Sequence, residues 1–266
     1  PNAMAILVGG SVARGYADRW SDVEIGVFWR IVPPEHSRAD LAVLAGLSDW
    51  RSHPDPSPVG ALEEDGIRDG IKVDLIHLDC ASVENTITAV VRHGDPALEH
   101  QVLLGTLQDG LPLEGHSSLA SWKARIATYP EKLRIATIQD NLIFGPHAWL
   151  EMLAERNDFL ILHDLLCRIG RSIVNIMLGI NGIYARSPAL KWVQQTIAAC
   201  TIAPANVAHR LDTLLRTDPR TAVATARLLI EETLTLIDQH VPGVDTTPVR
   251  QRISALPRGL TGSTTP

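Results

Sequence analysis

The sequence has 266 residues, of which 45% are hydrophobic and 20% are charged, and its formal net charge is −6. This length allows one large domain, or two smaller domains that each have a hydrophobic core. An acidic chain without a dense run of Lys or Arg argues against a long nucleic acid as substrate, because binding a phosphate backbone depends on a basic face.

The sequence also disfavours a membrane protein and a disulfide-stabilised secreted protein. No apolar run reaches the roughly 18 to 20 residues that a membrane span needs. No basic segment precedes the first apolar run, so no signal peptide is visible and a cytoplasmic location is expected. The three cysteines, Cys80, Cys167 and Cys200, are far apart and form no CxxC pair, so neither a disulfide nor a zinc site is expected.

The first part of the chain alternates short apolar runs with loops. Compact or β-branched apolar runs predict three strands, and Gly- and Pro-broken segments near 105–115 predict a last strand and turn. Helical runs are predicted between these strands. The predicted strands are 5–8, 23–29 and 71–78, and the predicted helices are 39–50 and 82–92.

After Gly115 the pattern becomes helical. Three of the later helices open with proline in the first turn, as expected of a helix start. The predicted helices are 130–144, 147–156, 159–178, 188–199, 204–216 and 219–240. The sequence therefore predicts an α+β chain with an α/β domain at 1–115, a helical domain at 116–242 and a loosely ordered tail at 243–266.

The turn after the first predicted strand has the composition of an anion site. The strand Ala5–Val8 ends in Gly9-Gly10-Ser11, and glycines allow a tight turn close to a ligand. Backbone N–H groups and a serine hydroxyl in such a turn bind anions, more so where a helix begins. Taken alone, an ordinary strand-to-helix turn explains these residues equally well. The segment matches neither the dinucleotide-binding motif nor the P-loop.

Two carboxylates follow at the start of the next predicted strand. Asp22 and Glu24 are two positions apart, so an extended backbone places both side chains on one face. Adjacent like charges are unfavourable unless a cation lies between them. Mg²⁺ binds one or two carboxylates and completes its shell with phosphate oxygens and water. The pair therefore indicates a site for Mg²⁺ and a triphosphate, with a solvated strand edge as the simpler alternative.

Asp74 is a third carboxylate, in the middle of the apolar strand 71–78. A buried, unpaired carboxylate is costly, so Asp74 needs a partner. A neighbouring strand that carries Asp22 and Glu24 would supply one through a shared metal. Three carboxylates can hold two ions, which activate the attacking oxygen and stabilise the leaving group. For Asp74 alone, a structural salt bridge is the alternative.

Together these motifs resemble the nucleotidyltransferase superfamily of the polymerase-beta type. The shared pattern is Gly-Gly-Ser, Asp-x-Glu about ten residues later, and an aspartate on a later strand. The segment Ser21–Glu24 and the helical second half are most similar to the antibiotic-modifying branch, such as the kanamycin and lincosamide nucleotidyltransferases. The motifs cover 5–30 and 71–78, and Tyr184–Trp192 is similar to a Tyr…Pro…Lys-Trp segment of that branch. The resemblance implies an N-terminal nucleotidyltransferase domain, with a mixed sheet flanked by helices, followed by an all-α helical bundle.

The resemblance also implies which residues bind the nucleotide. Gly10 and Ser11 would hold the β- and γ-phosphates. Arg14 and Lys191 would contact the triphosphate, although solvated charges are the simpler interpretation of both.

The catalytic and metal-binding residues implied by the resemblance are carboxylates. Asp22, Glu24 and Asp74 would bind two Mg²⁺ ions, and Asp74 would also accept the proton of the acceptor hydroxyl. In parts of the family a separate acidic residue of the helical domain is the base, and Glu131 and Asp140 are the candidates here.

The implied reaction transfers a nucleoside monophosphate from a nucleoside triphosphate, ATP in the first place, to a hydroxyl of a small-molecule acceptor. The resemblance makes an aminoglycoside-like acceptor the first hypothesis. A monomer or homodimer is expected. Two alternatives stay open: a transferase that modifies a protein or RNA, as in toxin–antitoxin systems, and a non-catalytic nucleotide sensor. The three carboxylates argue against the sensor.

Overall fold

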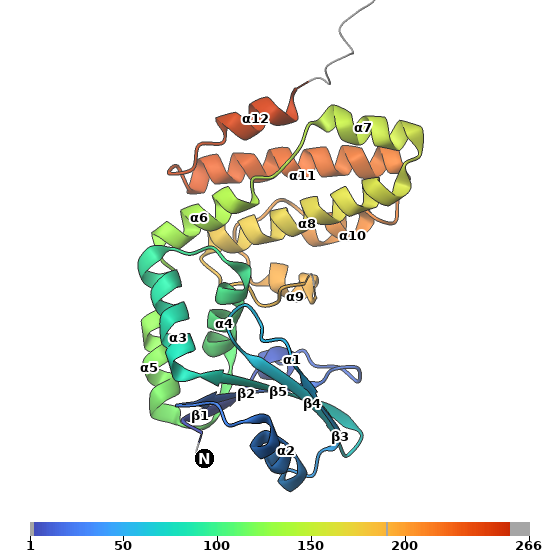
Figure 1. The fold of residues 1–266 in the computed structure, drawn as a ribbon. Helices are drawn as coiled ribbons and strands as arrows, with labels where there is room; N and C mark the ends of the chain where they lie inside the picture. The colour runs from blue at the N-terminus through green and yellow to red at the C-terminus, as the bar shows by residue number, and fades with distance from the viewer. Residues whose placement is uncertain (1–2, 190, 256–266) are drawn as a thin grey trace, which may run out of the picture. The chain divides into compact units, whose positions relative to one another are not determined.

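The computed structural model describes residues 3–189 and 191–255. These residues form two compact units (Figure 1). The first unit contains the described residues up to Leu133 together with Tyr184–Pro188, and the second contains the remainder. The first unit extends beyond the predicted boundary at residue 115 because helix α5 (His116–Ile126) buries Leu119 and Trp122 in its core.

The first unit is built on a six-stranded mixed sheet, which agrees with the predicted α+β class. The strand order is β3-β4-β5-β2-β1-β6; β2 and β5 are parallel and the other neighbouring strands are antiparallel. The strands are β1 (Ala5–Val8), β2 (Val23–Trp29), β3 (Ser48–His53), β4 (Leu62–Arg68), β5 (Ile71–Asp79) and β6 (Leu111–Glu114).

Helices flank this sheet (Figure 1). One sheet face meets the apolar core of the unit, where the ring of Trp122 packs edge-on against Phe28 with centroids 5.3 Å apart. Helix α2 lies against the opposite face, where Arg38 reaches Glu64. The helices of this unit are α1 (Gly10–Arg14), α2 (Glu35–Leu44), α3 (Cys80–Ile87), the π-helix η1 (Thr88–His93), α4 (Leu98–Asp109) and α5.

The elements of this unit differ from the prediction at several places. The helix predicted at 39–50 ends at Leu44, because Gly46 adopts φ +71° and the chain turns into β3. Strand β4 was not predicted, because its sequence LEEDGIR has low strand propensity. The strand forms by pairing with β3 on one side and β5 on the other.

Helix α4 replaces the start of the strand and turn predicted at 105–115. The sequence predicts Gly105 at the start of this strand and turn, but the residue lies inside the helix. A Cβ at this position would come within 2.5 Å of the carbonyl oxygen of Ala185, so the glycine allows a close approach of two segments. Only β6 remains of the predicted strand.

The described residues of the second unit form helices and loops. Helices α7 and α11 begin and end where the sequence predicted, and α8 packs against α11 and α7. Asp218 caps α11 by accepting hydrogen bonds from the backbone N–H groups of Arg220 and Thr221. The helices are α6 (Glu131–Asn141, whose residues up to Leu133 belong to the first unit), α7 (His147–Arg156), α8 (Phe159–Asn181), α9 (Val193–Ala198), α10 (Val207–Thr213), α11 (Pro219–His240) and α12 (Thr247–Ile253).

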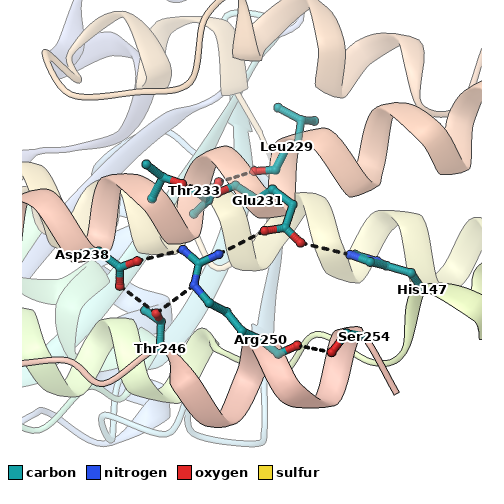
Figure 2. A network of polar contacts seen from close by, with 9 residues as sticks. His147, Leu229, Glu231, Thr233, Asp238, Thr246, Arg250 and Ser254 are labelled. Carbon is teal, nitrogen blue, oxygen red and sulfur yellow. Dashed lines mark hydrogen bonds and ion pairs between the residues drawn. The ribbon is translucent and has the colours of Figure 1, made fainter. Parts of the chain in front are cut away.

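Helix α12 corrects the predicted loose tail, which began at residue 243. The helix buries Val249 and Ile253. Its Arg250 donates hydrogen bonds to Glu231 at 3.1 Å and to Asp238 at 2.8 Å, both on α11 (Figure 2). These contacts attach the segment to the second unit; residues 256–266 of the predicted tail lie outside the described residues.

The described residues also bear on membrane spans and disulfides. No helix within the described ranges has both the length and the apolar character of a membrane-spanning segment. Cys80, Cys167 and Cys200 form no disulfide.

Candidate functional site

The strand register brings the predicted carboxylates together. Parallel pairing of β2 with β5 places Glu24 directly opposite Asp74. Asp22, two residues before Glu24, projects to the same face of the sheet. On its other side Asp74 lies opposite Asp65 of β4. Asp22, Glu24, Asp74 and Asp65 therefore form what we term the carboxylate row, on the sheet face that also carries Phe28.

A lysine that the sequence did not point to neutralises part of this row. The ammonium of Lys72 forms an ion pair with Asp74 Oδ1 and lies 4.0 Å from Asp22 Oδ2. Burial raises the pKa of Asp74, and its interaction with the Asp22 carboxyl raises the pKa further, against the lowering effect of Lys72. The hydrogen bond to Asp74 raises the pKa of Lys72. Two carboxylates thus share one ammonium, and the protonated form of Asp74 is favoured relative to an exposed aspartate.

The Gly-Gly-Ser turn lies against Glu24. The Gly9 N–H donates a 2.8 Å hydrogen bond to the backbone oxygen of Glu24. Gly10 has φ +59°, and a Cβ there would come within 2.6–2.9 Å of the Glu24 carboxyl atoms. Gly10 is therefore needed for both its backbone conformation and this close approach. Ser11 follows in α1 and is half-buried.

The two predicted phosphate-binding cations have different surroundings. Arg14 is not a solvated charge: its side chain is 9% exposed, its Nε donates to Asp109 Oδ2 at 2.8 Å, and its Nη1 donates to the Arg186 carbonyl at 3.2 Å. These contacts direct the guanidinium toward α4. Lys191 is an exposed residue of the second unit. The candidate bases Glu131 and Asp140 are exposed on α6.

Asp65, at the far end of the carboxylate row, holds a half-exposed histidine. Its Oδ1 lies 2.7 Å from His53 Nε2, and its Oδ2 lies 3.4 Å from Arg51 Nη2. The Asp65 side chain is only 7% exposed, and its Oδ2 is buried without a hydrogen bond among the described residues. The sequence did not indicate Asp65, because the run Glu63-Glu64-Asp65 reads as a solvated surface segment.

A second polar cluster, on the opposite sheet face, is structural. Glu64 accepts hydrogen bonds from Arg38 at 2.6 Å and Trp50 at 3.2 Å, and it lies 3.2 Å from His77 Nε2. Burial alone would raise the pKa of Glu64, but the hydrogen bonds with His77 and Arg38 outweigh burial and lower it. Trp29 donates to His77 Nδ1 at 3.0 Å, so both ring nitrogens of His77 are engaged and neither is available as a base.

The carboxylate row fits a divalent cation in part. Among residues 3–189 and 191–255, no group of three or more His, Cys, Asp or Glu side chains is arranged to hold a metal ion. Asp22 and Asp74, however, already share a cation, the ammonium of Lys72. Mg²⁺ needs only one or two carboxylates when phosphate oxygens complete its shell. The Asp22–Asp74 pair therefore fits one Mg²⁺ held with a nucleotide, whereas two ions on three carboxylates stays a prediction.

Comparisons with known proteins give limited matches. A family model described as "Domain of unknown function (DUF4037)" matches residues 97–193. No curated protein matches the sequence. Among the solved structures that match is a nucleotidyltransferase-like protein from Exiguobacterium sibiricum 255-15, with 13% identity and a TM-score of 0.38 over 90% of this chain and 70% of that one. This likeness is too distant to transfer any residue's role.

Proposed function

We propose that this chain is a Mg²⁺-dependent nucleotidyltransferase that moves a nucleoside monophosphate from a nucleoside triphosphate, ATP in the first place, to a hydroxyl of a small-molecule acceptor. The observation that carries the proposal is the parallel register of β2 and β5. It places Glu24 opposite Asp74 and brings Asp22 to the same sheet face. Like charges this close together are unfavourable without a cation between them. The carboxylates therefore indicate a site for a cation that is bound together with phosphate groups.

In the proposed reaction the acceptor oxygen attacks the α-phosphorus of the nucleotide. The bond from this phosphorus to the bridging oxygen of the β-phosphate breaks, and pyrophosphate leaves with that electron pair. The acceptor proton passes to a carboxylate of the row, and Asp74 is the first candidate for this base. Catalysis of this kind depends mainly on positioning and on stabilisation of charge.

The chain's own residues would divide these tasks. Asp22 and Asp74, with Glu24 beside them, would hold Mg²⁺, which neutralises charge on the triphosphate. The turn at Gly10 and Ser11 would bind the β- and γ-phosphates, since it lies against Glu24. We propose an aminoglycoside-like acceptor as the first class to test, because of the motif resemblance described above.

Ligand binding to the full chain tests the nucleotide site without knowledge of the acceptor. Thermal stability would be measured with ATP, GTP, CTP and UTP, with and without Mg²⁺. A ligand at a hundred times its Kd stabilises by about 2.7 kcal/mol, or about 5–10 °C for a domain of this size. We expect a Mg²⁺-dependent shift that is lost in Asp22→Asn and kept in the control Asp69→Asn, whose side chain is 90% exposed.

A transfer assay then separates the alternatives. Pyrophosphate release would be followed with aminoglycosides, with other small alcohols, and with protein and RNA acceptors. Release with small alcohols supports the proposal, and release only with a protein or RNA supports the macromolecular transferase. Nucleotide binding without release with any acceptor supports the sensor. A wild-type protein that shows no shift with any nucleotide refutes the nucleotide site.

A further inference from the structure

We propose that Lys72 is an exchangeable counterion of the nucleotide site. Its ammonium neutralises the Asp22–Asp74 pair in the ligand-free protein and moves to a phosphate group of the nucleotide when a divalent cation is bound between the two carboxylates. This inference rests on the proposed function and adds to it a nucleotide-binding residue that no motif indicates.

The geometry places Lys72 at the cation position of the pair. Lys72 and Asp74 are two residues apart on β5, so both project to the face of the carboxylate row. The register pairs Val23 with Val73, which sets Lys72 beside Asp22 on the neighbouring strand. The ammonium contacts Asp74 Oδ1 and is 4.0 Å from Asp22 Oδ2. A metal ion that uses these two carboxylates must therefore take the place of the ammonium.

The charge balance favours this exchange. One ammonium leaves the Asp22–Asp74 pair with a net negative charge. Asp65 adds a further carboxylate, whose Oδ2 is buried without a hydrogen bond among the described residues and lies 3.4 Å from Arg51 Nη2. A divalent cation matches the two charges of the pair. That cation would repel an ammonium beside it. The displaced ammonium would then form an ion pair with the phosphate oxygens of the nucleotide, which would be the nearest negative groups.

Lys72 is free to make this movement. Its side chain is 46% exposed, and lysine carries a compact charge on a flexible four-carbon stem. Lysine binds phosphate as a point charge, so it does not need the fixed approach of a guanidinium. Arg14, the predicted phosphate-binding cation of this unit, is instead held by Asp109 and the Arg186 carbonyl. Lys72 is therefore the better-placed cation for the triphosphate.

The exchange predicts effects of opposite sign on metal and nucleotide binding. The affinity for Mn²⁺ without nucleotide, and the affinity for ATP with Mg²⁺, would be measured by calorimetry on the full chain. In Lys72→Gln we expect Mn²⁺ affinity to rise about three- to tenfold, because a competing cation is removed. We expect ATP affinity to fall about tenfold, because a charged phosphate contact is lost. Lys72→Arg should restore most of the ATP affinity, and Lys132→Gln, an exposed lysine of the same unit, should change neither.

Each outcome decides the inference. Unchanged binding in Lys72→Gln, or a parallel loss of both ligands in a variant that unfolds like wild type, makes Lys72 a structural ion pair and overturns it. A wild-type protein that binds no Mn²⁺ overturns both this inference and the metal in the proposed function. Opposite shifts in affinity without pyrophosphate release with any acceptor leave the counterion role supported and refute only the catalytic step.

Discussion

Neutralising Asp74 should stabilise the ligand-free protein while it removes a ligand of the proposed metal site. Asp74 lies directly opposite Glu24 on one side and Asp65 on the other, and it also interacts with Asp22. Lys72 forms an ion pair with Asp74, and Arg51 and His53 contact Asp65. The substitution Asp74→Asn keeps the shape of the side chain and an oxygen that can accept from Lys72, and it removes one negative charge from the row.

The expected change in the free energy of unfolding follows from the contacts that oppose each other at Asp74. Like charges directly opposite on neighbouring strands destabilise by about 0.2–1 kcal/mol each, and Asp74 has two such neighbours. The ion pair with Lys72, whose side chain is 46% exposed, returns about 0.2–1 kcal/mol. The net gain in Asp74→Asn is then about 0.2–1 kcal/mol, which raises Tm by about 0.5–4 °C.

The gain should depend on pH with a defined sign. The pKa of Asp74 is raised above its usual value of 3.8, so the folded state disfavours the ionised form. The penalty is absent below pH 3.8 and appears as pH rises through the raised pKa. The stability difference between Asp74→Asn and wild type should be present at pH 7 and shrink at low pH, as measured by thermal unfolding at both.

A control substitution on the same strand, at Asp79, should lower the stability rather than raise it. Asp79 caps α3 by accepting from the Ser82 backbone N–H at 2.8 Å, and these hydrogen bonds lower its pKa despite partial burial. Asp79→Ala should destabilise by about 1 kcal/mol. If Asp74→Asn also destabilised by 1 kcal/mol or more at pH 7, the reasoning from charge repulsion would be refuted. With Mg²⁺ and ATP present, only wild type and Asp79→Ala should gain stability.

Three further predictions concern the scaffold. Glu64→Gln leaves the Arg38 guanidinium buried without a counter-charge and should cost about 3 kcal/mol in urea unfolding followed by tryptophan fluorescence; a cost below 1 kcal/mol would contradict this. Neither ring nitrogen of His147 has a hydrogen bond among the described residues, and Nε2 lies 3.6 Å from Glu231 Oε1. Burial, helped by Arg227, lowers the pKa of His147 below 6.5 against the raising effect of Glu231 and Glu151. The unfolded state then binds more protons, so wild type should lose stability as pH falls through 6.5, and His147→Gln should lose less; equal slopes would rule out this origin. Arg250→Ala removes the bridge from α12 to α11 and should expose α12 to faster hydrogen exchange with little change in α8.

Local signals were enough for much of the fold and for the shared sheet face of Asp22 and Glu24. The β-branched runs predicted β2 and β5, and Pro219 correctly marked the start of α11. The spacing of Asp22 and Glu24 required a shared face on any extended strand. These features depend on residues close together in the chain, so they could be read before the topology was known.

The tertiary structure decided the features that depend on distant partners. Strand β4 forms because β3 and β5 supply its hydrogen bonds, and Gly105 lies inside a helix because the carbonyl of Ala185 approaches it. The same dependence governs the site. Lys72 and Asp65 have no motif of their own, and they belong to the carboxylate row only through the register of β4, β5 and β2. A side chain's nearest charges are set by which strands pair and at which residue, and that choice is made by the packing of the whole sheet rather than by any single segment.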